Sequence, residues 1–223
     1  MEYYLYISES KVKMLFPQIP KETKGKLGAE ISANLGVLKA TVKSEKESQP
    51  KENPIAQLQA VIDYLKRSEK LGSMDKPESW IEDTLSARVI YLAENNQVVF
   101  FVGTSPGGTR FALGGSAANL LSHQKAETVQ IGWSFLPDLI QSLRIMVSVS
   151  DEKSSPESVE RFLSATAASN EFEWMDLLKA VQGASSGTTM RITFMAKKLL
   201  SGAHTQDGKF GVLATPLYVA MAQ

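Results

Sequence analysis

The residues best suited to chemistry lie in one glycine-rich stretch, Gly103-Thr-Ser-Pro-Gly-Gly-Thr-Arg-Phe-Ala-Leu-Gly-Gly-Ser116. Glycines expose backbone N–H groups, and successive N–H groups in a turn form a concave site for anions. A helix starting near Ser116 would point its positive end outwards at the same place. The stretch therefore predicts a site for a phosphate or a carboxylate. Its predicted ligand-binding residues are Thr104, Ser105, Gly107, Gly108, Gly114, Gly115 and Ser116.

The same glycines also fit a purely structural role, as a hairpin turn followed by a corner between a strand and a helix. The stretch completes neither a P-loop nor the dinucleotide-binding Gly-x-Gly-x-x-Gly pattern. Its two glycine pairs flank a strand of about five residues, whose ends lie about 15 to 17 Å apart. This separation disfavours one phosphate cradle and suits an extended nucleotide.

The chain offers no recognisable catalytic motif. It has no cysteine, which excludes disulfides, thiolate zinc sites and a cysteine nucleophile. The only histidines, His123 and His204, have no acidic or histidine neighbour at metal-ligand spacing. No Gly-x-Ser-x-Gly elbow supports a serine nucleophile. We predict no catalytic residue, no metal and no cofactor, and the sequence favours a protein that is not an enzyme.

Charge and hydropathy set further limits on partners and location. The 24 basic and 24 acidic side chains cancel, so no overall field attracts nucleic acid or an anionic membrane. The lysine-rich segment 9–51 is typical of a solvated face, with nucleic-acid binding as the alternative. No signal peptide is recognisable, and no run approaches the roughly 20 apolar residues that cross a bilayer. The natural location is the cytoplasm.

The elements that must position these residues follow from periodicity. Alternating or β-branched runs predict strands, and apolar side chains at helical spacing predict helices. The expected strands cover 3–7, 37–42, 87–93, 98–102, 110–113, 190–196 and 211–220. The expected helices cover 21–34, 54–70, 116–121, 155–166 and 174–181, with a strand and then a helix within 129–149.

These elements predict an α+β fold: a single globular domain over residues 1–223, with a mixed, mostly antiparallel sheet and about four to six packed helices. Pro216 cannot donate a ladder hydrogen bond, so its strand should lie at a sheet edge or bend there. An exposed edge would favour a protein partner or self-association.

Four short segments resemble a family of uncharacterised, mainly actinobacterial proteins of about this length. They are Tyr3-Tyr-Leu-Tyr-Ile-Ser8, Lys11-Val-Lys-Met-Leu-Phe-Pro-Gln-Ile19, Leu113-Gly-Gly-Ser116 and Thr215-Pro-Leu-Tyr-Val-Ala220. The resemblance spans nearly the whole chain. It implies a bacterial, cytosolic, single-domain protein with no agreed catalytic residues, encoded among conflict or signalling genes.

Besides nucleic-acid binding through the lysine-rich segment 9–51, two functions remain open at this point. The leading hypothesis is a non-enzymatic protein-binding or regulatory module, because the chain is well patterned for folding and has no catalytic motif. The alternative is a sensor or enzyme that binds a nucleotide or another phosphate-bearing small molecule at Gly103–Ser116.

Overall fold

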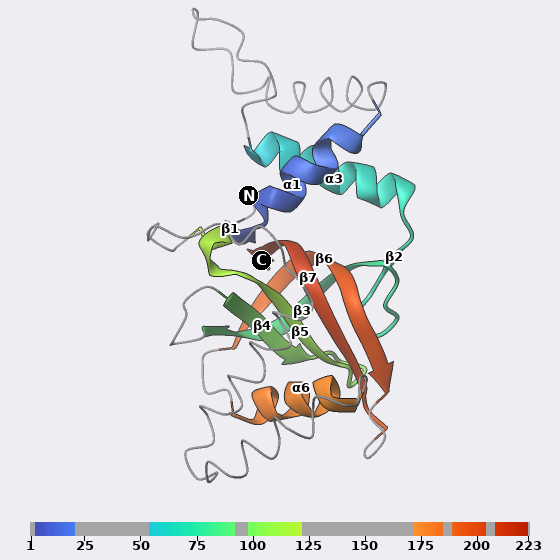
Figure 1. The fold of residues 1–223 in the computed structure, drawn as a ribbon, viewed down its shortest axis with the longest axis vertical. Coiled ribbons are helices and arrows are strands. Elements are labelled where there is room, and N and C mark those ends of the chain that lie inside the picture. The colour runs from blue at the N-terminus through green and yellow to red at the C-terminus, as the bar shows by residue number, and fades with distance from the viewer. Residues whose placement is uncertain are drawn as a thin grey trace, which may run out of the picture. The chain divides into compact units, whose positions relative to one another are not determined.

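The computed structural model describes residues 3–20, 54–91, 98–121, 172–184, 189–203 and 208–222 (Figure 1). The chain divides into two compact units. One comprises Met1–Ser8 and Leu71–Gln223, and the other comprises Glu9–Lys70. The single globular domain expected over 1–223 stays a prediction, and the two units are described separately.

The smaller unit consists of the helices α1 (Glu9–Leu15) and α3 (Pro54–Ser68) with the 3₁₀ turn η1 (Phe16–Gln18), and α1 contacts α3. Helix α3 confirms the predicted pattern. Its buried side chains include Leu58, Ile62 and Leu65, whereas Ile55 in the first turn is exposed. Lys66 and Arg67 lie in the last turn, where positive charge interacts favourably with the helix dipole.

The larger unit is built mainly from strands. They are β1 (Tyr3–Ile7), β2 (Leu71–Gly72), β3 (Trp80–Tyr91), β4 (Val98–Thr104), β5 (Arg110–Ser116), β6 (Thr189–Ala203) and β7 (Phe210–Met221). The 3₁₀ turn η4 (Ala117–Asn119) follows β5, and the helix α6 (Phe172–Ala184) precedes β6.

Five of these strands close into a β-barrel. Strands β3, β4 and β5 form an antiparallel meander, β7 pairs parallel to β5, and β6 pairs antiparallel to both β7 and β3. The cycle of pairing therefore returns to β3. Strand β1 extends the sheet from β7, and the two-residue β2 pairs with the start of β3.

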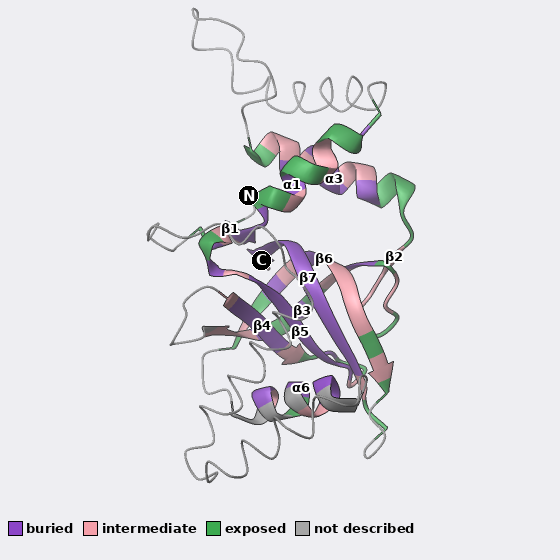
Figure 2. Cartoon of the chain, viewed as in Figure 1, coloured by how far each residue is buried: buried purple, intermediate pink, exposed green. Residues whose placement is uncertain are grey.

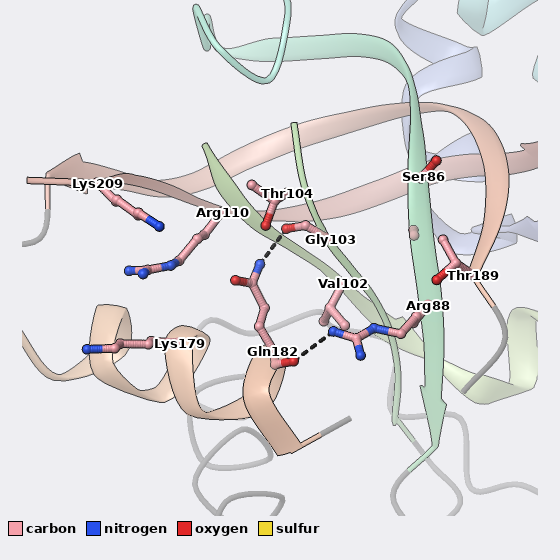
Figure 3. Close-up of a pocket in the computed structure, with 11 residues that line it drawn as sticks. Ser86, Arg88, Val102, Gly103, Thr104, Arg110, Lys179, Gln182, Thr189 and Lys209 are labelled. Atoms are coloured by element: carbon pink, nitrogen blue, oxygen red, sulfur yellow. Dashed lines mark hydrogen bonds between the residues drawn. The ribbon is translucent and has the colours of Figure 1, made fainter. Parts of the chain in front are cut away.

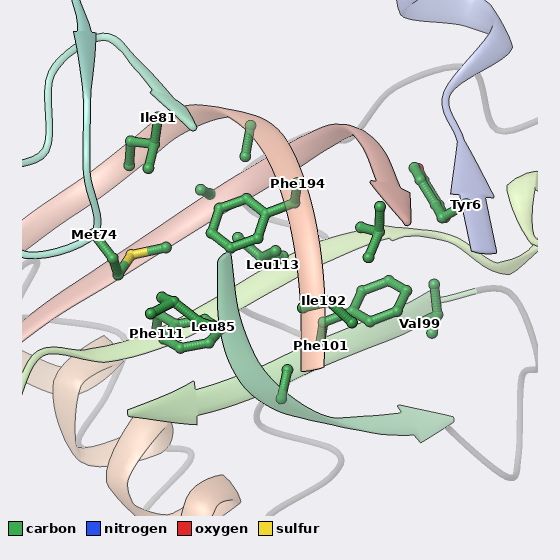
Figure 4. Close-up of a cluster of buried hydrophobic side chains, with 14 of the residues drawn as sticks. Tyr6, Met74, Ile81, Leu85, Val99, Phe101, Phe111, Leu113, Ile192 and Phe194 are labelled. Atoms are coloured by element: carbon green, nitrogen blue, oxygen red, sulfur yellow. The ribbon is translucent and has the colours of Figure 1, made fainter. Parts of the chain in front are cut away.

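Side chains alternate between the barrel interior and its outer surface, as the pleat of a strand requires. The interior cluster includes Phe101, Phe111 and Phe194 (Figure 4). Their neighbours Phe100 and Ala112 belong to a second buried cluster on the other side of the sheet. Strand β7 contributes to both clusters and is buried from Gly211 to Ala220 (Figure 2).

Helix α6 covers the outer surface of the barrel at β4, β5 and β7. Its buried side chains are Trp174, Met175, Leu178 and Val181. They pack in one cluster with Phe100, Val102, Ala112 and Leu213. A Cβ atom on Gly211 would overlap the sulfur of Met175, so a larger residue there would require the Met175 side chain to move. This packing fixes the helix that forms one wall of the site described below.

The predicted fold class is wrong. The described residues form a predominantly β structure with a closed five-stranded barrel, and they contain three short α-helices rather than four to six packed ones. Gly114-Gly115 does not end β5, which continues to Ser116, and the helix expected at 116–121 is the single turn η4. The elements expected within 21–53 and 122–171 lie outside the described residues.

Pro216 does not mark an edge strand, because β7 pairs with β1, β5 and β6. The alternative expectation, a bend at Pro216, stays a prediction, but the ladder is irregular at this point. The β6–β7 register shifts between Met195 and Ala196, which pair with Tyr218 and Pro216. The proline therefore lies where the ladder is already interrupted, which limits the cost of its missing N–H.

Candidate functional site

A pocket with a volume of about 490 Å³ lies on the outer side of the barrel beside α6 (Figure 3). Strands β3, β4 and β5 line it together with α6, the start of β6 and the residue before β7. All of these elements belong to the larger unit.

The lining of the pocket is strongly basic. It includes four cationic side chains, Arg88, Arg110, Lys179 and Lys209, and none of the eleven lining residues is acidic. Arg110 is only 8% exposed, Arg88 is half-buried, and the two lysines are exposed. A concave surface with charges of one sign concentrates its field inside the cavity. The pocket is therefore electrostatically suited to an anion.

The sheet and the helix place these cations by their regular geometry. Arg110 pairs with Thr104 at the end of the β4–β5 ladder, and it shares a face of β5 with Ala112, which packs under α6. Lys179 and Gln182 lie one turn apart on α6, next to the buried Leu178 and Val181. The packing of α6 on the barrel thus places Lys179 at the edge of the pocket.

Hydrogen bonds join the helix to two barrel strands within the pocket. Arg88 Nη2 donates to the backbone carbonyl of Gln182 at 2.7 Å, and Gln182 Nε2 donates to the backbone carbonyl of Gly103. The Gln182 carbonyl is among the last four of α6, which have no partner within the helix itself. Arg88 therefore stabilises the carbonyl end of α6 by both its hydrogen bond and its charge.

The remaining lining residues are hydroxyl-bearing or small. Ser86, Thr104 and Thr189 contribute hydroxyl groups, and Ala87, Val102 and Gly103 complete the wall. These groups, with the cations, can bind an anion and donate hydrogen bonds to polar substituents on it.

Of the predicted ligand-binding residues, only Thr104 lines this pocket. Ser105, Gly107 and Gly108 form the turn between β4 and β5, and that turn already holds an anion from the chain itself. The Ser105 hydroxyl donates to Asp75 Oδ1, and the Gly107 N–H donates to Asp75 Oδ2 at 3.1 Å. Gly108 adopts φ +88°, a conformation that favours glycine.

The surroundings of Asp75 change its ionisation. Desolvation by itself raises the pKa of the carboxyl, but hydrogen bonds from Ser105, Thr109 and Gly107 outweigh it, so the pKa lies below its ordinary value. The turn therefore binds a carboxylate of the same chain, and the predicted binding of a separate ligand there stays a prediction.

The second glycine pair lies at the opposite end of β5. Ser116 pairs with Val98, whereas Arg110 pairs with Thr104, so the hairpin separates the two predicted corners. A Cβ atom on Gly115 would overlap the hydroxyl of Tyr6, which gives this glycine a packing role. Ser116 makes no side-chain capping hydrogen bond to η4. The structure thus does not bring Gly114, Gly115 and Ser116 together with the β4–β5 turn.

Sequence reasoning missed all four cations of the pocket. They come from four segments far apart in the chain, and no motif connects them. One local signal was present, because Arg110 opens a strand of otherwise small or apolar residues and is buried there. A charged residue in such a strand is unusual enough to indicate a site.

No group of three or more potential metal ligands lies together within the described residues, and His123 and His204 lie outside them. Among the helices of the described segments, none has the length and apolar character needed to span a membrane.

Comparison with known proteins assigns the chain to a protein family. A family model described as "Family of unknown function (DUF7019)" matches residues 2–223, and the chain belongs to this family. This confirms the predicted membership of an uncharacterised family, while the actinobacterial origin stays a prediction. Neither a curated protein nor a solved structure matches the chain.

Proposed function

We propose that this protein binds a small anionic molecule, carrying a phosphate or carboxylate group, in the pocket between the barrel and α6. The observation that carries the proposal is the lining of that pocket: four cationic side chains and, among the eleven described lining residues, no carboxylate. The volume of about 490 Å³ lies within the range of about 300 to 1,000 Å³ typical of small-molecule sites.

Electrostatics favours an anion here more than at an ordinary basic surface patch. Arg110 is 8% exposed, and opposite charges attract each other more strongly away from water than at an exposed surface. Asp176, which lies one turn before Lys179 on α6, does not line the pocket. An anion entering the cavity would therefore meet guanidinium and ammonium groups on several sides.

This proposal modifies the alternative hypothesis drawn from the sequence. The phosphate-bearing ligand is retained, but its site moves from the glycine corners to the neighbouring basic pocket, with Thr104 common to both. A non-enzymatic role fits a lining suited to binding. The protein-binding or regulatory module, its place in a conflict or signalling system and its cytoplasmic location remain predictions.

Isothermal titration calorimetry with inorganic phosphate, sulfate and succinate tests the proposal. We expect at least one of these anions to bind, with an affinity that falls as the salt concentration rises. Arg110→Gln should weaken binding at least tenfold. The matched control is Arg191→Gln, since Arg191 is an exposed cation on β6 that does not line the pocket. No binding by any of the three anions, or an equal loss in both variants, would contradict the proposal.

A further inference from the structure

The two ends of the pocket differ in chemistry. Arg110, Lys179 and Lys209 lie on one side of Gln182 in Figure 3, and we call them the cationic end. Ser86, Arg88 and Thr189 lie on the other side, and we call them the hydroxyl end. Arg88 pairs directly with Thr189 across the β3–β6 ladder, which fixes these two residues side by side.

The two ends are separated by a distance that the ladders define. Arg88 pairs with Val102 on β4, and Val102 pairs with Ala112 on β5, two residues from Arg110. Neighbouring strands lie about 4.8 Å apart, and a strand rises about 3.3 Å per residue. Arg88 and Arg110 are separated by two strand spacings and by two residues along a strand, which places their backbones about 12 Å apart. A ligand that reaches both ends must therefore be longer than a simple inorganic anion.

Charge favours a phosphate monoester at the cationic end. A phosphate monoester carries about −1.5 to −2 charges at pH 7 and three strong acceptor oxygens, whereas a carboxylate carries one charge. Three cationic side chains around one end match the larger charge and the larger number of acceptors better. Arg110 can also bind two phosphate oxygens with its planar fork of donors.

The hydroxyl end favours a hydroxylated body over a nucleobase. Ser86 and Thr189 can donate and accept hydrogen bonds, and Arg88 supplies further donors. None of the eleven described lining residues is aromatic, and their apolar side chains are only those of Ala87 and Val102. Bases in nucleotide sites commonly stack on aromatic side chains. The described lining has groups that can form hydrogen bonds with sugar hydroxyls, but it has no aromatic side chain on which a base could stack.

The volume leads to the same conclusion. The volume of about 490 Å³ lies within the range of about 300 to 1,000 Å³ of sites that hold whole organic ligands. A bare phosphate has only five heavy atoms and would leave most of this space to water. We infer that the ligand is a sugar phosphate or polyol phosphate, bound with its phosphate at the cationic end and its hydroxyl groups at the hydroxyl end. This inference rests on the proposed function.

Calorimetry with six probes tests the inference: inorganic phosphate, glycerol 3-phosphate, ribose 5-phosphate, glucose 6-phosphate, unphosphorylated ribose and adenosine monophosphate. We expect at least one of the three hydroxylated phosphates to bind at least tenfold more tightly than inorganic phosphate. Ribose should not bind measurably, and the adenine of adenosine monophosphate should add no affinity over ribose 5-phosphate.

Two sets of variants separate failure of the inference from failure of the proposed function. Thr189→Val and Ser86→Ala should reduce the advantage of the hydroxylated phosphate over inorganic phosphate at least fivefold. Lys209→Ala, at an exposed residue before β7, should weaken both probes. Thr84→Val is the control, because Thr84 lies on the same face of β3 as Ser86 but outside the pocket.

The outcomes are distinct. Binding of inorganic phosphate with no gain from any of the three hydroxylated phosphates would overturn the inference and leave the anion site intact. Adenosine monophosphate binding at least tenfold more tightly than all three would overturn it in favour of a nucleotide. Unchanged selectivity in Thr189→Val and Ser86→Ala would also overturn it. Absence of binding by every anionic probe would overturn the proposed function itself.

Discussion

The carboxylate of Asp75 accepts a hydrogen bond of 3.1 Å from the backbone N–H of Gly107, and it also binds the hydroxyl of Ser105. These contacts tie the segment between β2 and β3 to the turn between β4 and β5. The Ser105 hydroxyl oxygen in turn accepts a hydrogen bond from the Thr109 N–H at 3.0 Å. One carboxylate thus organises the turn next to the candidate pocket.

Replacing this carboxylate should change the pH dependence of stability. The hydrogen bonds hold the pKa of Asp75 below its ordinary value, so their stabilising effect is complete above that ordinary value and is lost as the pH falls through the folded-state pKa. We expect Asp75→Asn to lower the free energy of unfolding by about 1 kcal/mol at pH 7, a modest value because Asp75 is exposed. Urea denaturation should show the difference from the wild type shrinking below about pH 4.

A double-mutant cycle with Ser105→Ala controls this experiment. Because both residues belong to one hydrogen-bonded unit, the two substitutions together should cost less than the sum of their separate effects. Additive effects would show that Asp75 and Ser105 do not act as one unit. A difference that stays constant down to pH 2 would show that the charge of the carboxylate contributes nothing through these contacts.

Gly115 should tolerate alanine poorly because the Cβ atom would lie 2.8 Å from the Tyr6 ring carbon Cζ and closer still to its hydroxyl. We expect Gly115→Ala to lower the free energy of unfolding by about 1 to 3 kcal/mol, the usual cost of overpacking. Gly202→Ala is the matched control, since Gly202 lies in β6 and a Cβ atom there meets nothing within 4 Å.

The second substitution Tyr6→Phe tests the cause. It removes the hydroxyl, which is the nearest atom to the new methyl group. Gly115→Ala should therefore cost less in the Tyr6→Phe background than in the wild type. An equal cost in both backgrounds, measured by thermal and urea unfolding, would place the clash elsewhere.

Tyr6 should resist alkaline titration. Burial raises the pKa of its phenol to about 12, although hydrogen bonds from Asn119, Ser8 and Ser116 counteract part of this effect. The unfolded state loses the proton near the ordinary value of 10, so stability should fall between pH 10 and about 12. Tyr6→Phe should remove this part of the pH dependence. Ultraviolet titration in which Tyr6 ionises near pH 10 in the folded protein would contradict the prediction.

Arg88 should be required for the docking of α6. Arg88→Gln removes the charge beside the last carbonyls of the helix, and we expect a loss of about 1 to 2 kcal/mol in the free energy of unfolding. Hydrogen exchange should show faster exchange of the α6 amides. The exposed Arg191→Gln should stay within about 0.5 kcal/mol of the wild type. Equal effects of the two variants would rule out a special role for Arg88.

Local patterns predicted several strands because each has its own alternation. The β-branched, aromatic and apolar residues predict the first strand, Tyr3–Ile7, and the two C-terminal strands. They also predict the antiparallel pairing of 88–91 with 99–102. The first half of β3 was missed because Glu82-Asp83 resembles a turn. In the structure, Asp83 instead accepts hydrogen bonds from the N–H groups of Met74 and Thr84.

Closure of the barrel could not be read from the sequence. It depends on the pairing of β3 with β6 and on the parallel pairing of β5 with β7, which join residues roughly 100 positions apart. The candidate pocket could not be predicted from the sequence for the same reason. Its four cations come together only after these strands pair and α6 packs on them: Arg88, Arg110, Lys179 and Lys209. Their spacing in the sequence therefore does not indicate that they lie close together.

The position of β7 in the chain affects how the protein is made. It is the last described strand in sequence order, yet it is the direct neighbour of β1, β5 and β6. About 90 residues separate the end of β5 from the start of β7, and translation at about 5 to 20 residues per second takes roughly 5 to 20 s to cover them. During that interval, the nascent chain holds β1 and one side of β5 without the partner that covers them in the finished fold. Such unpaired edges invite association between chains, so we expect nascent chains that lack β7 to associate more readily than the finished protein.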